Sequence, residues 1–443
     1  MKKALITLAV SLLILITLLG VDLAKCDGNV LLKPLLGIET STDYTDGSDY
    51  SNVFADSTAA DAPKKQKYAD KKLTVTAPKL NETVSETTVE EASGTDMPEE
   101  VEISGVADSE RGYEFYFPLL SEEEKSVYRI VYDAFSQIET GVTIPTVDDD
   151  TMNKVVNAVK NDHPELFYLD QIGYTHYTMG GQIQRTTLSV TYSDTKAMIE
   201  TKQRMVDAVV SEMVASIPAG ADDYTKVKTI YEEIINNTQY NSAAPDNQTM
   251  ISALLNKSSV CAGYSRSMQY ILNSIGVPTT VVEGVSLITG EQHAWNLCKL
   301  EDGYYYVDVT WGDASYVNNG RNGASGEQLN YDYLLVTEEE ICRTHGIDKT
   351  YSLPECNLIA NNYFVREGLF IYEYNQDEIK AIFDRGYSNG QSTVSFKCAN
   401  LEIYDEVYGN LIKKSQVFDM LSPDTGTISY VVDEEQRTLC FWL

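Results

Sequence analysis

The feature that most restricts the fold of this chain is an amphipathic stretch that begins at Cys261 and is followed at once by strand-like sequence. Gly276 stands where a glycine ends a helix, and Pro278 prevents its continuation. The sequence therefore predicts a helix that starts at Cys261. Its apolar face follows the i, i+3, i+4, i+7 spacing and comprises Cys261, Tyr264, Ser265, Met268, Ile271, Leu272 and Ile275.

Strands are expected directly after this helix. Residues 279–283 are rich in β-branched side chains, and residues 293–299 and 304–311 also read as strands. Since only four residues (300–303) separate the last two, they should form an antiparallel hairpin. We therefore predict an α+β core, in which the Cys261 helix packs against an antiparallel sheet.

The loop length fixes the register of that hairpin. A four-residue loop pairs Lys299 with Tyr304, which places Asp308 diagonal to His293 on the same face of the sheet. A three-residue loop would place Asp308 on the opposite face. By the same alternation, Cys298 should point away from His293.

Cys261 has the position of an activated nucleophile. A helix N-terminus carries partial positive charge and N–H groups without intrahelical partners, and both stabilise a thiolate, the reactive form of cysteine. One of these N–H groups could also bind the oxyanion of an acyl intermediate. The following Ala262 is small enough to let a substrate carbonyl approach.

His293 and Asp308 complete a nucleophile-activating set. The chain has only four histidines, and a base is needed near the sulfur. Asp308 lies in an apolar run, where an unpaired carboxylate would be costly, so we expect it to pair with the His293 imidazole on the neighbouring strand.

Other residues near this set have weaker claims to a role. Trp295 and Trp311 could line a substrate groove, although core packing is the favoured interpretation. The same two interpretations apply to Tyr264. Tyr240 could donate a hydrogen bond to the oxyanion. No metal site or cofactor is expected, and no spaced-acid calcium loop occurs.

Two segments, VCAGYSRSMQYILNSIGVP and HAWNLCKLEDGYYYVDVTW, resemble the transglutaminase-like superfamily, whose fold is similar to that of papain-like cysteine proteases. The close resemblance covers about residues 225–313 and suggests a bacterial secreted or surface member. It implies that Cys261 is the nucleophile, His293 the general base and acid, and Asp308 its orienting partner. It leaves open whether water or an amine accepts the acyl group.

The N-terminal part looks like an export signal. Lys2 and Lys3 precede the apolar run 4–21, as in a secretory signal, and the run could also remain as a membrane anchor. Whether the segment is cleaved, lipidated or retained stays open. Residues 27–111 are acidic and rich in Ser and Thr, which predicts a disordered spacer.

The predicted organisation has five parts. They are a signal peptide or anchor (1–26), the spacer (27–111), an α+β lead-in (112–222), the catalytic region (223–350) and a small C-terminal α+β domain (351–443).

Composition restricts the partners. The net charge of −32 argues against nucleic-acid binding. We expect a protein or peptide substrate, which could be a cell-wall peptide, and a monomer attached to membrane or wall through its N-terminus or secreted. For the seven cysteines, the pairs Cys342–Cys356 and Cys398–Cys440 are conceivable, and free buried thiols are about as plausible.

The favoured function is an exported cysteine enzyme that forms an acyl-thioenzyme on protein or peptide amides, with hydrolysis slightly preferred over amine transfer. The alternative is a catalytically silent binding or adhesion module on the same fold.

Overall fold

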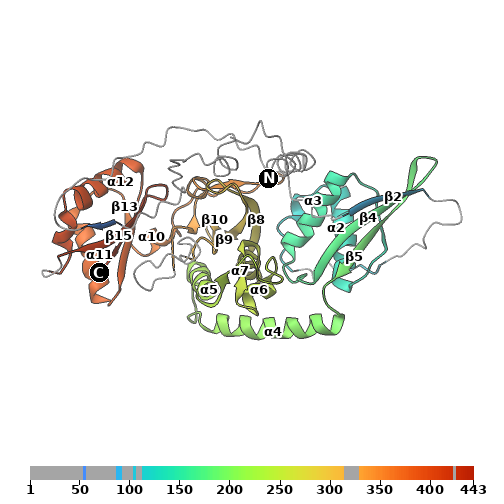
Figure 1. The fold of residues 1–443 in the computed structure, drawn as a ribbon, viewed down its shortest axis with the longest axis horizontal. Helices are drawn as coiled ribbons and strands as arrows, with labels where there is room; N and C mark the ends of the chain where they lie inside the picture. The colour runs from blue at the N-terminus through green and yellow to red at the C-terminus, as the bar shows by residue number, and fades with distance from the viewer. Residues whose placement is uncertain (1–52, 56–85, 92–102, 106–111, 314–328, 423–425) are drawn as a thin grey trace, which may run out of the picture. The chain divides into compact units, whose positions relative to one another are not determined.

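The computed structural model describes residues 53–55, 86–91, 103–105, 112–313, 329–422 and 426–443 (Figure 1). The expected signal segment lies outside the described residues. Among the helices of the described part, none is long and apolar enough to cross a membrane.

The lead-in combines two helices with a four-stranded sheet of order β2-β4-β5-β3. The run Ser121-Glu122-Glu123-Glu124 predicts a capping box, and Ser121 and Glu124 form it at the start of the first helix. Asp148 caps the second helix. The turn at Gly180 and Gly181, both with positive φ, joins β4 to β5. These elements are η3 (Phe117–Leu119), α2 (Glu122–Gln137), β3 (Val142–Ile144), α3 (Asp149–Asp162), β4 (Leu169–Met179) and β5 (Gln182–Tyr192).

Two strands lie inside the segment predicted to be a disordered spacer, so that prediction is wrong at these residues. β2 (Glu86–Glu91) pairs in parallel with β4, and β1 (Val53–Ala55) pairs with a C-terminal strand. Pairing along the edge of a sheet uses backbone groups and needs no apolar side chains, which is why composition did not reveal it. The other spacer residues, apart from 103–105, lie outside the described part.

Helices connect the lead-in to the Cys261 region. The sequence offers Asp222 or Asp223 as the cap of α5, and Asp222 caps it through the N–H of Thr225. Two residues of β6 pair in parallel with β7, just before Cys261. The elements are α4 (Lys196–Ala215), α5 (Asp223–Asn237), β6 (Gln239–Tyr240), α6 (Met250–Leu254) and β7 (Ser258–Ser259).

The predicted core is present. Helix α7 (Cys261–Ser274) packs on β8 and β9 of a five-stranded sheet with α5 beside it (Figure 1), and Gly276 follows it with φ of 80°. The sheet order β11-β10-β9-β8-β12 makes β9 the central strand, and every pairing in it is antiparallel. Its strands are β8 (Thr279–Ser286), β9 (Gln292–Lys299), β10 (Tyr304–Val307), β11 (Leu334–Val336) and β12 (His345–Ile347).

The hairpin register is confirmed, because Tyr304 pairs with Lys299 across the four-residue loop. The strand is shorter than predicted, however, and ends at Val307. The Asp308 carboxylate accepts the N–H groups of Thr310 and Trp311, which turns the chain out of the sheet.

A second difference concerns His345. The capping pattern from Thr337 to Glu340 predicts a short helix that ends near His345. Instead, α9 (Glu338–Ile341) ends earlier and His345 starts β12. β12 pairs with the outer edge of β8, with His345 opposite Ser286. A long-range pairing of this kind overrides local propensity.

The C-terminal part is α+β, with a five-stranded sheet of order β1-β15-β16-β14-β13 and its own hydrophobic core, separate from the one that the lead-in shares with the α7 region. The sequence predicted one helix near residues 376–383; α11 is longer, and α10 and α12 were not predicted. The elements are α10 (Tyr363–Arg366), β13 (Phe370–Ile371), α11 (Gln376–Ser388), β14 (Thr393–Cys398), α12 (Leu401–Tyr408), a π-helical turn (Gly409–Lys413), a 3-10 helix (Gln416–Met420), β15 (Ile428–Asp433) and β16 (Thr438–Trp442).

Candidate active site

Cys261 is the first residue of α7 and packs against the middle of the sheet. Its neighbour Val260 is the N-cap and offers no side-chain cap. The Gly263 N–H donates to the Val260 carbonyl, and the N–H groups of Cys261 and Ala262 are the first-turn groups that we consider for binding an anion. The thiol is half-buried against Ala262, Val281 and Ala294. The fold therefore presents this sulfur at the positive end of a helix dipole.

His293 and Asp308 lie beside this thiol. The Nε2 of His293 is 2.6 Å from Oδ2 of Asp308, and both side chains are buried. Since Nε2 faces the carboxylate, Nδ1 is the ring nitrogen left for the Cys261 thiol, which is among the groups that raise the pKa of His293. The structure thus brings together the three residues that the sequence singled out, in the order thiol, imidazole, carboxylate.

The electrostatics favour a thiolate–imidazolium pair. Burial alone would raise the pKa of the Cys261 thiol, but the hydrogen bond and charge of His293, followed by the N–H of Ala294, lower it below the ordinary value. For His293, burial favours the neutral ring, but the charge of Asp308 and the hydrogen bonds to Asp308 and Cys261 raise its pKa to about 10. A proton shared in this way leaves the sulfur nucleophilic near neutral pH.

Asp308 remains ionised although it is completely buried. Burial would raise the pKa of its carboxyl, but the charge and hydrogen bond of His293, and then those of His345, hold the pKa well below its usual range. Its other oxygen, Oδ1, accepts the N–H groups of Thr310 and Trp311 at 2.9 and 3.0 Å. Four donors therefore fix this carboxylate from both sides.

His345 is the site residue that the sequence reasoning missed. Its Nε2 is 2.9 Å from Oδ2 of Asp308, the same oxygen that His293 contacts. The chain has only four histidines, so each could have been considered as a candidate site residue. Nothing local pointed to Asp308, because His345 was expected at a helix end, 37 residues away.

The two tryptophans contact the histidines. Trp295 is fully buried and stacks on His293, with ring centroids 5.8 Å apart. Trp311 is nearly buried and packs against His293 at 5.7 Å and against His345 at 4.6 Å. Both rings therefore help to hold the imidazoles in place.

Tyr264 and Ala262 are buried on α7. The Tyr264 hydroxyl lies within hydrogen-bond distance of the Thr238 carbonyl (3.0 Å) and of Asp313 Oδ2 (3.1 Å), so it ties α7 to the chain on both sides. Tyr240 lies in β6, half-buried, with its ring 6.4 Å from that of Tyr264. Their roles toward a substrate stay predictions.

The remaining cysteines differ from Cys261. Cys298 is fully buried, and burial raises the pKa of its thiol to about 12, with Thr279 Oγ1 3.5 Å from its sulfur. None of the six cysteines in the described part is in a disulfide, so neither conceivable pair is formed. Cys26 lies outside the described residues.

The cluster of His293, Asp308 and His345 also has a metal-like arrangement. It is the one group of three or more His, Cys, Asp and Glu residues in the described ranges whose ligand atoms lie within 4.8 Å of one another. Hydrogen bonds account for these distances, because two imidazole nitrogens face a single carboxylate oxygen at 2.6 and 2.9 Å. The expectation that no metal is needed remains a prediction.

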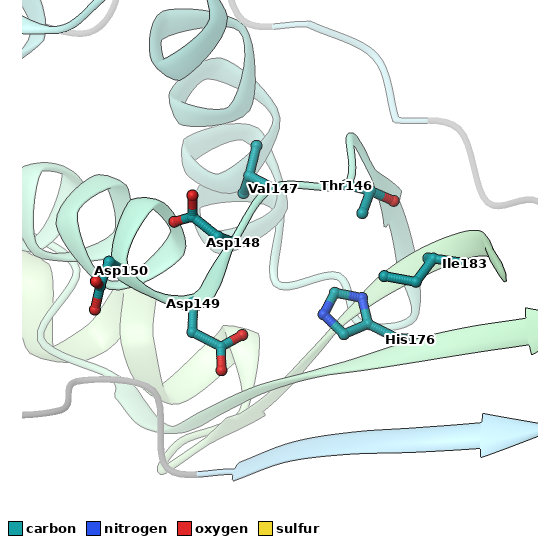
Figure 2. Close-up of a pocket in the computed structure, with 7 residues that line it drawn as sticks. All are labelled: Thr146, Val147, Asp148, Asp149, Asp150, His176 and Ile183. Carbon is teal, nitrogen blue, oxygen red and sulfur yellow. The ribbon is translucent and has the colours of Figure 1, made fainter. Parts of the chain in front are cut away.

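A cavity of about 640 Å³ lies elsewhere, in the lead-in (Figure 2). Its polar side chains have roles in the fold: Asp148 caps α3, Asp149 accepts the hydroxyl of Tyr174, and His176 Nδ1 is 2.8 Å from Thr186 Oγ1. No nucleophile is among its lining residues, so we do not assign the chemistry to it. The lining consists of Thr146, Val147, Asp148, Asp149, Asp150, His176 and Ile183.

Comparison with known proteins gives a family for the central segment. Residues 211–309 match the family model of the transglutaminase-like superfamily. No curated protein matches the chain.

Among solved structures, the chain is similar to one titled a TGase, with 13% identity and a TM-score of 0.24, covering 36% of this chain and 54% of the other. It is also similar to a candidate cysteine protease from Cytophaga hutchinsonii (13% identity, TM-score 0.22, 31% and 62% covered). A third is the periplasmic domain of TgpA from Pseudomonas aeruginosa (18%, 0.22, 31% and 58%). The chain therefore spans only about half to three fifths of the length of these proteins.

Proposed function

Because residues 211–309 form a transglutaminase-like domain, we propose that this chain is a cysteine enzyme that forms an acyl-thioenzyme at Cys261 on protein or peptide amides. The observation that carries the proposal is the buried hydrogen bond between His293 and Asp308 beside the Cys261 thiol, whose pKa His293 lowers. A buried set of this kind lowers the pKa of the thiol and raises the pKa of the imidazole. Acylation needs the thiolate and the imidazolium that these two shifts favour.

In the first step, the Cys261 thiolate attacks the carbonyl carbon of the amide. A carbon–sulfur bond forms, and the carbonyl electron pair moves to oxygen as an oxyanion. The first turn of α7 supplies N–H groups that can bind this oxyanion, those of Cys261 and Ala262 among them. Tyr240 is the further donor that we propose here.

In the second step, the proton on His293 moves to the leaving nitrogen as the carbon–nitrogen bond breaks. An amine departs, and a thioester remains on Cys261. Asp308 stabilises the imidazolium before this transfer and keeps the ring in one orientation afterwards.

In the third step, neutral His293 removes a proton from the acceptor, which attacks the thioester carbon and releases the thiol. Water as acceptor gives a carboxylate, and a primary amine gives a new amide. We favour water slightly, because water needs no dedicated binding site. Export to the cell surface and a protein or cell-wall peptide substrate belong to the same proposal.

The test incubates the full chain with glutamine-containing and cell-wall-type peptides, with and without a fluorescent primary amine. A new carboxylate in both reactions indicates a hydrolase, and incorporation of the amine indicates a transferase. Cys261→Ala is the matched control and should give neither product. Failure of every peptide to turn over, together with a Cys261 no more reactive than the exposed Cys342, would contradict the proposal.

The second candidate, a binding or adhesion module, predicts that turnover is absent while peptide binding persists in Cys261→Ala. The buried ion-paired triad argues against it, because a silent module has no need to keep a buried carboxylate charged.

A further inference from the structure

Asp308 serves two histidines, and only one of them contacts the nucleophile. His345 is 1% exposed and lies in β12, on the far side of β8 from His293 in the sheet order. Its Nε2 is 2.9 Å from Asp308 Oδ2, and its Nδ1 is 2.8 Å from Thr344 Oγ1. Both ring nitrogens therefore have partners.

The hydrogen bonds determine the protonation of this ring. Asp308 is ionised and can only accept, so Nε2 of His345 must carry a proton. Burial lowers the pKa of His345 in spite of the opposing contributions of Asp308, which keeps the ring neutral. Nδ1 then has no proton and accepts the Thr344 hydroxyl. His345 is thus a neutral donor to the carboxylate that His293 shares.

The ring of His345 is also fixed by packing. Its centroid lies 4.6 Å from that of Trp311, 4.8 Å from Trp295 and 5.6 Å from Tyr333. The two tryptophans also pack on His293, so one aromatic shell positions both imidazoles. A rotation of either ring would disturb the other.

We propose that His345 is a positioning residue for the acylation chemistry: its Nε2–H holds Oδ2 of Asp308 where His293 can share it, and it thereby maintains the Cys261 thiolate. The inference rests on the proposed function, since it assumes that Cys261 is the nucleophile. Without His345, Oδ2 of Asp308 would keep only its contact with His293, while Thr310 and Trp311 would still hold Oδ1. The position of Oδ2 would then depend on the same imidazole that it has to orient.

The titratable groups that face His345 are few. Asp308 and His293 contribute directly, and the hydroxyl of Tyr333 lies within the aromatic shell. The other neighbours include the neutral hydroxyl of Thr344, the backbone of Ile341 and the tryptophan rings, none of which titrates. A change in the pH dependence of Cys261 in a His345 variant would therefore be transmitted through Asp308 and His293.

The experiment measures the rate at which iodoacetamide modifies Cys261 between pH 4 and pH 9 in the full chain, together with kcat/KM on a turned-over peptide. In His345→Phe, which keeps an aromatic ring but no donor, the acid limb should move to higher pH, and the rate at pH 6 should fall about 10-fold or more, as expected for a lost hydrogen bond to a charged group. His345→Gln, whose side-chain amide can still donate to Asp308, should recover most of the loss.

Two further variants keep the outcome interpretable. Thr344→Val removes the donor to Nδ1 with little change of shape and should shift the limb in the same direction by a smaller amount, which tests the inference even where His345→Phe does not fold. His176→Phe alters another buried histidine, whose Nδ1 contacts Thr186, and should leave the profile unchanged.

A folded His345→Phe protein whose profile overlaps that of the wild type, or moves to lower pH, would overturn the inference. So would a folded His345→Gln protein as impaired as His345→Phe. These results differ from a failure of the proposed function, in which wild-type Cys261 itself reacts no faster than Cys342.

Discussion

Asp162 of the lead-in and Asp308 of the candidate site are both buried carboxylates next to a histidine, and they do different things. Asp162 accepts the N–H groups of residues 115–117 at 2.8 to 3.0 Å and the hydroxyl of Tyr128 at 2.9 Å. These partners clamp the first described segment of the lead-in onto α3. Asp308 also accepts two N–H groups, but its other oxygen faces two imidazoles.

The pKa values of the two carboxyl groups are shifted in opposite directions. Burial raises the pKa of Asp162 to about 6 in spite of its hydrogen bonds. The pKa of Asp308 is lowered, because the His293 and His345 contributions outweigh burial. The charge of the neighbouring His163 does not outweigh burial at Asp162, whereas two imidazoles that face one oxygen directly do so at Asp308.

The histidines differ in their outward contacts as well. His163 has Glu165 2.8 Å from Nδ1 and Tyr128 3.0 Å from Nε2, with Glu114 at 3.5 Å, so both ring nitrogens face structural partners. His293 has Asp308 on Nε2, and the Cys261 thiol is the further group that raises its pKa. A buried Asp–His pair can therefore serve catalysis when the histidine also faces a nucleophile, as His293 faces Cys261.

Removing the Cys261 thiol should have the largest effect on peptide turnover. Cys261→Ala should reduce peptide turnover by about 10⁴-fold or more, since no other group can form the thioester. Thermal unfolding should change little, because the thiol is only half-buried. Cys342→Ala, at an exposed cysteine, is the control and should keep full activity. Residual turnover above 1% in Cys261→Ala would contradict the assignment.

Neutralising the two carboxylates should separate their roles. Asp308→Asn should lower kcat/KM by about 10³-fold, because an amide no longer stabilises the imidazolium. Asp162→Asn should leave kcat/KM of the folded protein within about threefold and cost about 2 kcal/mol of stability, since its NH₂ group cannot accept the N–H donors. Steady-state kinetics and urea unfolding measure both; equal kinetic losses would erase the distinction.

His163 should make stability depend on pH. Burial disfavours the charged ring, but hydrogen bonds to Glu114 and Glu165 raise the pKa of His163 to about 9, above the unfolded value of about 6.5. The stabilisation is therefore fully present below pH 6.5 and is lost as pH rises through 9. His163→Gln should be more destabilising at pH 6 than at pH 10, by about 3 kcal/mol. Urea unfolding at both pH values checks this, and a pH-independent difference would refute it.

The smallest effect is expected at Tyr264. Its hydroxyl contacts Thr238 and Asp313 and is buried, so Tyr264→Phe should cost about 1 kcal/mol of stability. Activity should remain within about threefold of wild type if its role is confined to packing. A larger loss of kcat/KM with unchanged stability would instead assign Tyr264 to substrate binding.

The sequence predicted those parts of the fold that local patterns specify. The capping box at Ser121, the cap at Asp222 and the glycine stop at Gly276 are signals within a few residues, and each is confirmed. The loop length between Lys299 and Tyr304 determined the hairpin register for the same reason.

The parts that were missed depend on long-range pairing. β2 is defined by the edge of β4, and β12 by the edge of β8, and neither carries a local strand pattern. Since His345 reaches Asp308 only through β12, its place in the site could not be derived from sequence spacing. Cys261, His293 and Asp308 could be predicted from the sequence because one helix start and one hairpin determine their positions.

The most direct test of the account is the pH dependence of Cys261 alkylation in the wild-type chain. A thiol whose pKa is lowered by His293 should show an acid limb well below the ordinary thiol pKa of about 8.5. It should also react at pH 6 at least about 10-fold faster than Cys342, whose pKa burial raises to about 11, so the position of the limb is the deciding readout. An acid limb at or above the ordinary thiol pKa, with Cys261 no faster than Cys342, would contradict the assignment of Cys261 as an activated nucleophile.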